Sequence, residues 1–281
     1  MTSNFSTLPL QGKTILVTRS TGQSSHFTQL LSTAGATVIE MPALEITAPS
    51  SWESLDCAIA NLSTFNWLIL TSSNAVNYFF DRLMEKGENA PNLGSINIAV
   101  VGEKTAQSLK QRSLQPDFIP PNFVADSLVG NFPEPLSGKK VLFPRVESGG
   151  REVLVKEFTA QGAEVVEVPA YQSCCPSSIP SEAEFALQNH TIDIITFASS
   201  KTVKFFSQLL AKKFAKNEDD NQSQVVKDFL QGVCIASIGP QTSKTCLSLI
   251  GRVDVEAEEY TLDGLTQGLI RWVGLRSSNK C

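Results

Sequence analysis

The chain has 281 residues, of which 42% are hydrophobic and 18% are charged, and its formal net charge is -5 at pH 7. The length predicts two domains of ordinary size, and the composition is too apolar for a disordered protein. The acidic balance argues against a broad nucleic-acid-binding surface, which would need an excess of Lys and Arg. No apolar run approaches the roughly 18 residues that cross a membrane. We therefore expect neither nucleic acid nor a membrane as a partner.

The first residues, MTSNFSTLPL, lack the charged start and apolar core of a secretory signal. We expect a cytoplasmic protein, with the plastid stroma as the alternative for a form that has lost a transit peptide. The six cysteines make no CxxC pair, and the two histidines, His26 and His190, are far apart in sequence. The sequence therefore predicts reduced structural thiols and no metal site.

Short apolar strands alternate with helices along the first half of the chain. The segment TILVTR at 14–19 predicts a strand, and Phe27, Leu30 and Leu31 follow at helical spacing before Gly35, which suits a helix end. Further strands are expected at TVIEM (37–41), WLILTS (67–72), NIAVVG (97–102) and FIP (118–120), with helices between them. This alternation is typical of a parallel sheet that is covered on both faces.

The second half repeats the first. GKTILVTR from Gly12 returns as GKKVLFPR from Gly138, at an offset of 126 residues. The blocks that begin at Leu30 and Trp67 return at an offset of 127, and those that begin at Ile98 and Ala125 return at 137. The extra residues fall in the polar stretch 211–224, where an exposed loop would accept them. Several blocks in one order indicate a duplication.

Each copy predicts a five-stranded flavodoxin-like unit, so the fold class is α/β with two such domains facing each other across a cleft. The copies could fold one after the other, near 12–134 and 138–274. Alternatively, the chain could leave the first domain after its second strand, build the second domain whole, and return. PALEITAP from Pro42 and PAYQSCCP from Pro169 are equivalent, extended and Pro-bounded, as paired linkers would be. The repeat alone leaves both connectivities open.

Polar residues stand where the predicted strands end and helices begin. In open parallel sheets, ligands bind outside the carboxyl ends of the strands, and helix N-termini there attract carboxylates or phosphates. Ordinary helix capping by Ser and Thr is the alternative for any one turn, but equivalent turns in both copies favour an anion site. The residues at these ends are Arg19, Ser72, Ser73, Gly102, Thr105, Arg145, Ser199, Ser200, Gly239 and Thr242. The chain has neither GxGxxG after its first strand nor GxxxxGK[ST], so a nucleotide site is not expected.

An ordered set of short motifs resembles the uroporphyrinogen-III synthase family, from about Lys13 to Trp272. The set is Thr71-Ser72-x-x-Ala75-Val76, Val101-Gly102-x-x-Thr105-Ala106, Phe143-Pro144-Arg145, Val168-Pro169-x-Tyr171 and Ile238-Gly239-Pro240-x-Thr242. The resemblance implies the discontinuous arrangement, with one domain of 1–45 plus 172–281 and the other of 46–171. It also implies a monomer without metal or organic cofactor, and a transient contact with the preceding enzyme of tetrapyrrole biosynthesis.

The substrate implied by the resemblance is hydroxymethylbilane, a linear tetrapyrrole with eight carboxylates. It would be cyclised to uroporphyrinogen III with inversion of ring D and loss of water. Tyr171 matches the family's linker tyrosine and is the expected catalytic group, because a phenol donates hydrogen bonds at neutral pH. Its counterpart in the other copy is Leu44. The expected substrate-binding groups are the strand-end residues named above, together with Arg151 and Lys201.

Two other functions fit the same pattern. A non-catalytic module with two α/β domains could clamp an anion or a tetrapyrrole and act as a sensor. A flavodoxin-type electron carrier is a second rival, although the duplication and the missing FMN phosphate loop argue against it.

Overall fold

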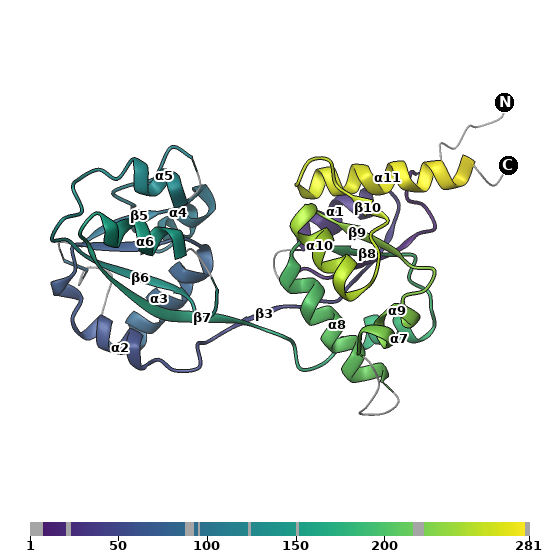
Figure 1. The fold of residues 1–281 in the computed structure, drawn as a ribbon, viewed down its shortest axis with the longest axis horizontal. Helices are drawn as coiled ribbons and strands as arrows, with labels where there is room; N and C mark the ends of the chain where they lie inside the picture. Colours follow the sequence, from purple (N-terminus) through teal and green to yellow (C-terminus); the bar gives the residue numbers. More distant parts are fainter. Residues whose placement is uncertain are drawn as a thin grey trace. The chain divides into compact units, whose positions relative to one another are not determined.

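The computed structural model describes residues 8–20, 24–87, 93–94, 96–122, 125–149, 152–215 and 222–278. The chain divides into two compact units, shown in Figure 1. Unit 1 combines Met1–Glu45 with Cys174–Cys281, and unit 2 is Ile46–Ser173. The second crossing lies two residues beyond the predicted boundary between 171 and 172. The chain therefore has the discontinuous connectivity, with unit 2 inserted into unit 1.

Unit 1 is built on a five-stranded sheet in the order β10-β9-β8-β1-β2, and its neighbouring strands pair in parallel. Its strands are β1 (Thr14–Val17), β2 (Thr37–Glu40), β8 (Ile194–Phe197), β9 (Cys234–Ser237) and β10 (Val255–Glu256). Its helices are α1 (Ser25–Thr33), α7 (Ser181–Gln188), α8 (Ser200–Phe214), α9 (Gln222–Phe229), α10 (Pro240–Leu249) and α11 (Leu262–Ser278).

Unit 2 has a second five-stranded sheet, in the order β3-β7-β6-β4-β5. Its strands are β3 (Glu45–Thr47), β4 (Trp67–Leu70), β5 (Asn97–Val100), β6 (Lys140–Val146) and β7 (Glu164–Cys174). Its helices are α2 (Glu53–Ala60), the 3-10 turn Leu62–Thr64, α3 (Ser73–Glu85), α4 (Glu103–Lys110), α5 (Ala125–Gly130) and α6 (Glu152–Ala160). The predicted strand at 118–120 is reduced to one bridge between Ala99 and Phe118, and β3 supplies the fifth strand instead.

Each sheet combines strands from both copies of the repeat. Unit 1 takes β1 and β2 from the first copy and β8, β9 and β10 from the second. Unit 2 takes β6 and β7 from the second copy and β4 and β5 from the first. Both sheets thus follow the flavodoxin-like order, in which the first strand lies between the second and the third. The predicted α/β fold with two five-stranded sheets is confirmed.

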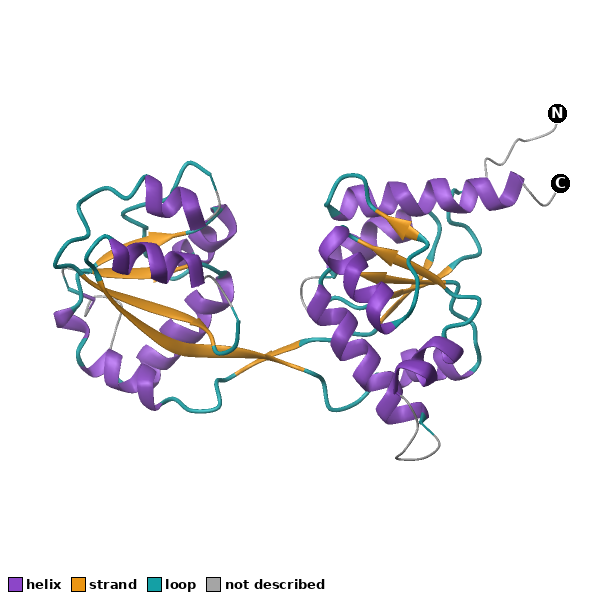
Figure 2. Cartoon of the chain, viewed as in Figure 1, coloured by secondary structure: helices purple, strands orange, loops and turns teal. Residues whose placement is uncertain are grey.

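Both sheets are buried on two faces, which explains why their strands are continuously apolar. In unit 1, Leu16 packs into one hydrophobic cluster while its neighbours Ile15 and Val17 pack into another. In unit 2, Leu68 and Ile69 are divided between two clusters in the same way. Figure 2 shows helices on either side of the strands in each unit. The carboxyl ends of the parallel strands are therefore left at one edge of each sheet, where loops lead into helices.

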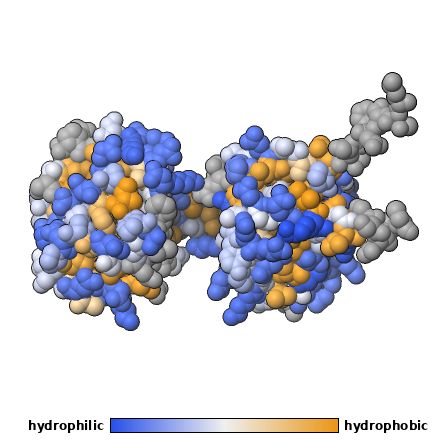
Figure 3. Space-filling model, turned by 90° about the horizontal axis from the view of Figure 1, so that it is seen from above, coloured by the Kyte–Doolittle hydropathy of each residue, from blue (hydrophilic) through white to orange (hydrophobic). Residues whose placement is uncertain are grey.

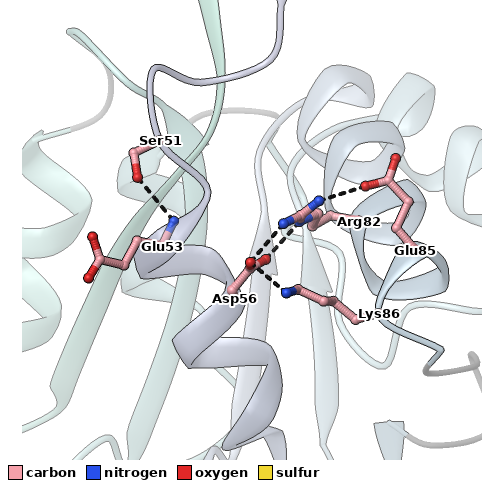
Figure 4. A network of polar contacts seen from close by, with 6 residues as sticks. All are labelled: Ser51, Glu53, Asp56, Arg82, Glu85 and Lys86. Atoms are coloured by element: carbon pink, nitrogen blue, oxygen red, sulfur yellow. Dashed lines mark hydrogen bonds and ion pairs between the residues drawn. The ribbon is translucent and has the colours of Figure 1, made fainter.

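A charged network joins α2 to α3 in unit 2 (Figure 4). The Arg82 guanidinium donates to both Asp56 carboxylate oxygens, through Nε and Nη2, at 2.7 Å each. Lys86 Nζ lies 2.7 Å from the same carboxylate, and Arg82 Nη1 donates to Glu85 at 2.8 Å. The hydrogen bonds from Arg82, and to a smaller extent from Lys86, lower the pKa of Asp56 to about 2.

Asp56→Asn is expected to lower the free energy of unfolding by about 2 kcal/mol at pH 7, because the folded state would lose its bidentate ion pair. A carboxylate with a depressed pKa stabilises the fold above its unfolded pKa, near 4, and this contribution fades as the pH falls through about 2. Urea unfolding at pH 7 and pH 2.5 should therefore show a smaller difference between wild type and variant at the lower pH. Glu85→Gln is the control, since it removes an exposed carboxylate from the same arginine. An equal difference at both pH values would contradict this interpretation.

Figure 3 shows hydrophobic residues scattered among hydrophilic ones on the face that it draws. Within the part of the chain that the structure describes, no helix combines the length and apolarity needed to cross a membrane.

Candidate functional site

At the carboxyl edge of unit 2, a serine begins the helix that follows β4. Ser72 has an extended backbone, with φ -156° and ψ 155°, and its Oγ accepts a hydrogen bond from the N–H of Ala75 at 3.0 Å. This is an N-cap, which satisfies one of the free amides in the first turn of α3. The positive end of the helix dipole therefore lies beside the Ser72 hydroxyl.

Tyr171 meets this helix start from β7. Its hydroxyl lies 3.1 Å from Ser72 Oγ, although the two residues are 99 positions apart in sequence. Its ring stacks on Tyr78 of α3, with centroids 5.9 Å apart and an interplanar angle of 26°. Tyr78 is fixed in turn, because its hydroxyl donates to the carbonyl of Ile46 in β3 at 3.0 Å. The phenol of Tyr171 is thus positioned by a ring on one side and a capping hydroxyl on the other.

The backbone of Tyr171 is held by the end of β6. The strand register shifts between Arg145 and Val146, so that Val146 lies opposite Tyr171. The N–H of Glu147 then donates to the Tyr171 carbonyl at 2.8 Å. The Glu147 carboxylate accepts hydrogen bonds from the N–H and hydroxyl of Ser50, and these bonds lower its pKa. The loop after β3 is therefore hydrogen-bonded to the end of β6, next to the register shift that places Tyr171.

The second helix start at this edge is α4. Gly102 is its N-cap with φ 96° and ψ 148°, a conformation that favours glycine. The side chain of Ser73 bridges the two helix starts by donating to the carbonyl of Lys104 at 3.2 Å. Thr105 follows in the first turn, but its hydroxyl donates to the Val101 carbonyl at 3.0 Å and the residue is only 4% exposed. The amides and Ser73 are thus better placed than Thr105 to meet a ligand.

Unit 1 has the same turns at its own carboxyl edge. Ser199 caps α8 with its Oγ 3.2 Å from the N–H of Thr202, and Ser200 donates to the Gln241 carbonyl at 2.8 Å. Gly239 is the N-cap of α10, and Thr242, 4% exposed, follows in the first turn. These contacts repeat those of Ser72, Ser73 and Gly102, as the offsets of 127 and 137 predict. The edge of unit 1 has Leu44 at the position of Tyr171 and therefore no equivalent phenol.

The predicted cations have different surroundings. Arg145 forms an ion pair with Glu167 and donates to the Gly149 carbonyl at 2.6 Å, so its charge is already neutralised. Arg19, its counterpart at the end of β1, is partly buried, and this burial lowers its pKa. Lys201 is partly buried in the first turn of α8. Arg151 lies outside the described residues.

Three residues near these edges were not predicted as site residues from the sequence. Tyr78 and Glu147 position Tyr171, while Tyr260, which is 65% exposed, lies over Gly239. The chain contains only three tyrosines, and all three lie near these helix starts. The low number of tyrosines could have pointed to them in the sequence, because the hydroxyl of a tyrosine usually finds a hydrogen-bond partner and so does more than pack.

Four of the described cysteines are free thiols: Cys57, Cys175, Cys234 and Cys246. Burial raises the pKa of both Cys234 and Cys246 to about 12, which makes them unreactive. Among the residues that the structure describes, no three His, Cys, Asp or Glu side chains gather as metal ligands would. The groups that the two edges offer to a ligand are therefore serine and tyrosine hydroxyls and backbone amides.

Comparison with known proteins identifies the family. Residues 25–267 match the family model described as uroporphyrinogen-III synthase HemD. The chain is also 52% identical to the uroporphyrinogen-III synthase of Synechococcus elongatus over 264 residues, which cover 94% of this chain and 97% of that protein. The chain belongs to the uroporphyrinogen-III synthase family. The synthase of Escherichia coli is a more distant relative, 24% identical over 72% of this chain and 82% of that protein.

Solved structures of this synthase family have the same fold. The enzyme from Helicobacter pylori matches with a TM-score of 0.58 at 18% identity, covering 91% of this chain and 97% of that one. A mutant enzyme from Thermus thermophilus matches with a TM-score of 0.56 at 16% identity, covering 94% and 99%. The expected family and fold are thus confirmed, whereas the roles of individual residues in this synthase stay predictions.

Ser72→Ala and Ser199→Ala form a matched pair of variants in this synthase. Both should lose an N-cap, which costs about 1 kcal/mol of stability. Only Ser72→Ala also removes a hydrogen bond to Tyr171, so we expect its kcat to fall roughly tenfold further than that of Ser199→Ala. Steady-state kinetics and thermal unfolding of both variants check this difference. Equal losses of kcat would show that Ser72 acts only as a cap.

Proposed function

We propose that this synthase converts hydroxymethylbilane into uroporphyrinogen III, with Tyr171 as the group that assists departure of the substrate hydroxyl. The observation that carries the reaction is the 52% identity to a uroporphyrinogen-III synthase over nearly the full length of both chains. The observation that supports the role of Tyr171 is its 3.1 Å contact with the capping serine of α3.

The hydrogen-bond pattern favours one direction for the Ser72–Tyr171 contact. Ser72 Oγ already accepts from the Ala75 amide, so its own proton is available to donate to the Tyr171 oxygen. The Tyr171 proton would then point toward the substrate hydroxyl. Partial negative charge that develops on the phenol oxygen would be stabilised by Ser72 and by the positive end of α3.

In the proposed first step, the carbon–oxygen bond of the terminal hydroxymethyl group breaks and the hydroxyl leaves as water with the proton from Tyr171. The lone pair of the adjacent pyrrole nitrogen supplies the electrons, which leaves an azafulvenium cation. The substituted carbon of ring D attacks this cation and forms a spiro intermediate. That intermediate fragments and closes again with ring D inverted. Loss of a ring proton, which restores the protonation of Tyr171, completes the net loss of one water.

Carboxylate binding is assigned to the helix starts of each unit. Free amides and hydroxyls at α3, α4, α8 and α10 can hold carboxylates without a basic surface, which suits a chain of net charge -5. Ser73 and Ser200, which join neighbouring helix starts, are the proposed side-chain contacts, with Arg19 and Lys201 as added positive charge. The paired state of Arg145 and the buried hydroxyl of Thr105 suggest that these two organise the edge and leave direct contact to their neighbours.

The reaction is tested by supplying hydroxymethylbilane to the purified protein, oxidising the products and separating the porphyrin isomers. Hydroxymethylbilane closes without help to the type I ring, so the fraction of type III should rise with protein concentration. A product that stays type I at every concentration would overturn the proposed activity and favour a binding protein.

We also propose that the synthase is a monomer of the cytoplasm. Four free thiols among the described residues, Cys57, Cys175, Cys234 and Cys246, fit a reducing compartment. Light scattering coupled to size-exclusion chromatography should give a mass near 30.5 kDa. A mass twice as large would contradict the monomer.

A further inference from the structure

Unit 1 contains a cavity of about 480 Å³ between α8, α9 and α10. The cavity begins one helical turn beyond the Ser200–Gln241 contact, because Lys204 and Thr245 each follow that contact by four residues. Its polar lining is Lys204, Ser207, Gln208, Ser223, Lys244, Thr245 and Ser248. Val226 and Leu249 add an apolar part to the wall.

The equivalent place in unit 2 is filled. The repeat offsets align Ser207 with Phe80 and Leu249 with Arg112. Phe80 is buried, and the Arg112 guanidinium lies over its ring at 5.7 Å while donating to Asp81 at 2.7 Å. The helix starts above have the same contacts in both units, so the helix pairs are packed in the same register. The cavity therefore follows from particular side chains of unit 1 and is not a general property of the fold.

Two serine hydroxyls, one in α8 and one in α10, are buried without a hydrogen-bond partner among the described residues. Ser207 is 8% exposed and lines the cavity, and its Oγ has no hydrogen-bond partner among the described residues. Ser243, 6% exposed, likewise has an unpartnered Oγ, and its counterpart in unit 2 is the apolar Ala106. An unpartnered buried hydroxyl destabilises a fold unless a ligand or water satisfies it. Unit 1 thus has buried serines where unit 2 has the apolar Phe80 and Ala106. These serines lower the stability of unit 1 unless a ligand or water satisfies their hydroxyls.

The charge of the lining is positive. Lys204 and Lys244 stand on facing helices, and their counterparts in unit 2 are the neutral Asn77 and Gln107. None of the described lining residues is acidic. Two lysines in the lining of a hydroxyl-rich, partly apolar cavity match an anion with an apolar body better than a bare ion.

We propose that the α8–α9–α10 cavity is a second ligand site of this synthase, which binds a small carboxylate with an apolar, ring-sized body. The lysines would pair with the carboxylate, Ser207 would donate to it, and Val226 and Leu249 would contact the body. The inference rests on the cavity and on its comparison with unit 2, independently of where the tetrapyrrole binds.

Three probes and three variants test the site in the full chain. Benzoate, benzamide and inorganic phosphate are titrated while amide resonances of α8 and α10 are followed by NMR. We expect saturable shifts with benzoate, and binding weaker by roughly tenfold or more with the uncharged benzamide and with phosphate, which lacks the body. The variants give unit 1 the residues of unit 2: Ser207→Phe, Lys204→Asn and Lys244→Gln.

Ser207→Phe should abolish benzoate binding by filling the cavity. Each lysine variant, which changes a surface position and should fold normally, should weaken binding about tenfold. Unchanged benzoate affinity in Lys204→Asn and Lys244→Gln, or shifts that never saturate in the wild type, would overturn the site. Equal affinity for benzoate and benzamide would overturn the proposed pairing with the lysines.

Discussion

Tyr171→Phe is expected to lower kcat for uroporphyrinogen III formation by roughly 100-fold, the lower range for loss of a general acid. The value of KM should change little, because the phenyl ring keeps its stack on Tyr78 and its place in β7. Only the hydroxyl that contacts Ser72 is lost. As the enzymatic rate falls, the uncatalysed type I ring should take a larger share of the product.

Tyr78→Phe is the matched control, since it removes the neighbouring hydroxyl and keeps the stacked ring. Its lost bond to the Ile46 carbonyl should cost about 1 kcal/mol of stability and less than about threefold in kcat. Steady-state kinetics with separation of the isomers measures both variants. If Tyr171→Phe retains the wild-type kcat, or if Tyr78→Phe loses as much, Tyr171 is not the acid.

Gly102→Ala is expected to destabilise unit 2 by about 1–3 kcal/mol, because its φ of 96° and ψ of 148° strain any residue with a Cβ. The turn also presents the first amides of α4 at the proposed carboxylate site. We therefore expect KM to rise along with the loss of stability, as measured by urea unfolding and steady-state kinetics.

Gly239→Ala in the equivalent turn of unit 1 should behave differently. Gly239 has an extended backbone, with φ 164° and ψ 178°, which alanine adopts without strain. The new methyl group would lie 2.9 Å from Cδ1 of Tyr260, and this exposed ring can turn aside. Its stability should therefore stay within about 0.5 kcal/mol of wild type. Equal destabilisation by the two substitutions would contradict the difference between the turns.

Much of the fold follows from the repeat. Continuous apolar strands between helices required sheets that are covered on both faces, and the structure has them. The exchange of strands between the two copies could not be derived from periodicity, since either connectivity buries the same residues. The strand at 118–120 was wrong because Phe118 makes only one bridge to Ala99, while the linker residues Glu45–Thr47 pair with β7.

The candidate site could be predicted in outline. The rule that parallel strands end at one edge placed Ser72, Ser73 and Gly102 together, as the structure does. The sequence could not show that Arg145 is neutralised by Glu167, because both residues recur in other surroundings as Arg19 and Glu40. It also could not reveal the stack of Tyr78 on Tyr171, because Tyr171 is placed by the register shift between Arg145 and Val146.

The two edges differ where an asymmetric reaction would need it. Both have capped helices that can hold carboxylates, but in unit 2 the capping Ser72 contacts the Tyr171 hydroxyl, whereas in unit 1 the Tyr260 ring lies over Gly239. In the proposed reaction, the duplicated turns bind carboxylates of the substrate and Tyr171 acts on the one hydroxyl that leaves.

The central claim is that Ser72 and Tyr171 act on the substrate hydroxyl as one unit. A double-mutant cycle with Ser72→Ala, Tyr171→Phe and both together, read as kcat for type III formation, measures their coupling most directly. We predict that the double variant is no slower than Tyr171→Phe alone, apart from the loss that Ser199→Ala shows for a missing cap. If the separate losses instead multiply in the double variant, Ser72 and Tyr171 act independently and the proposed unit does not exist.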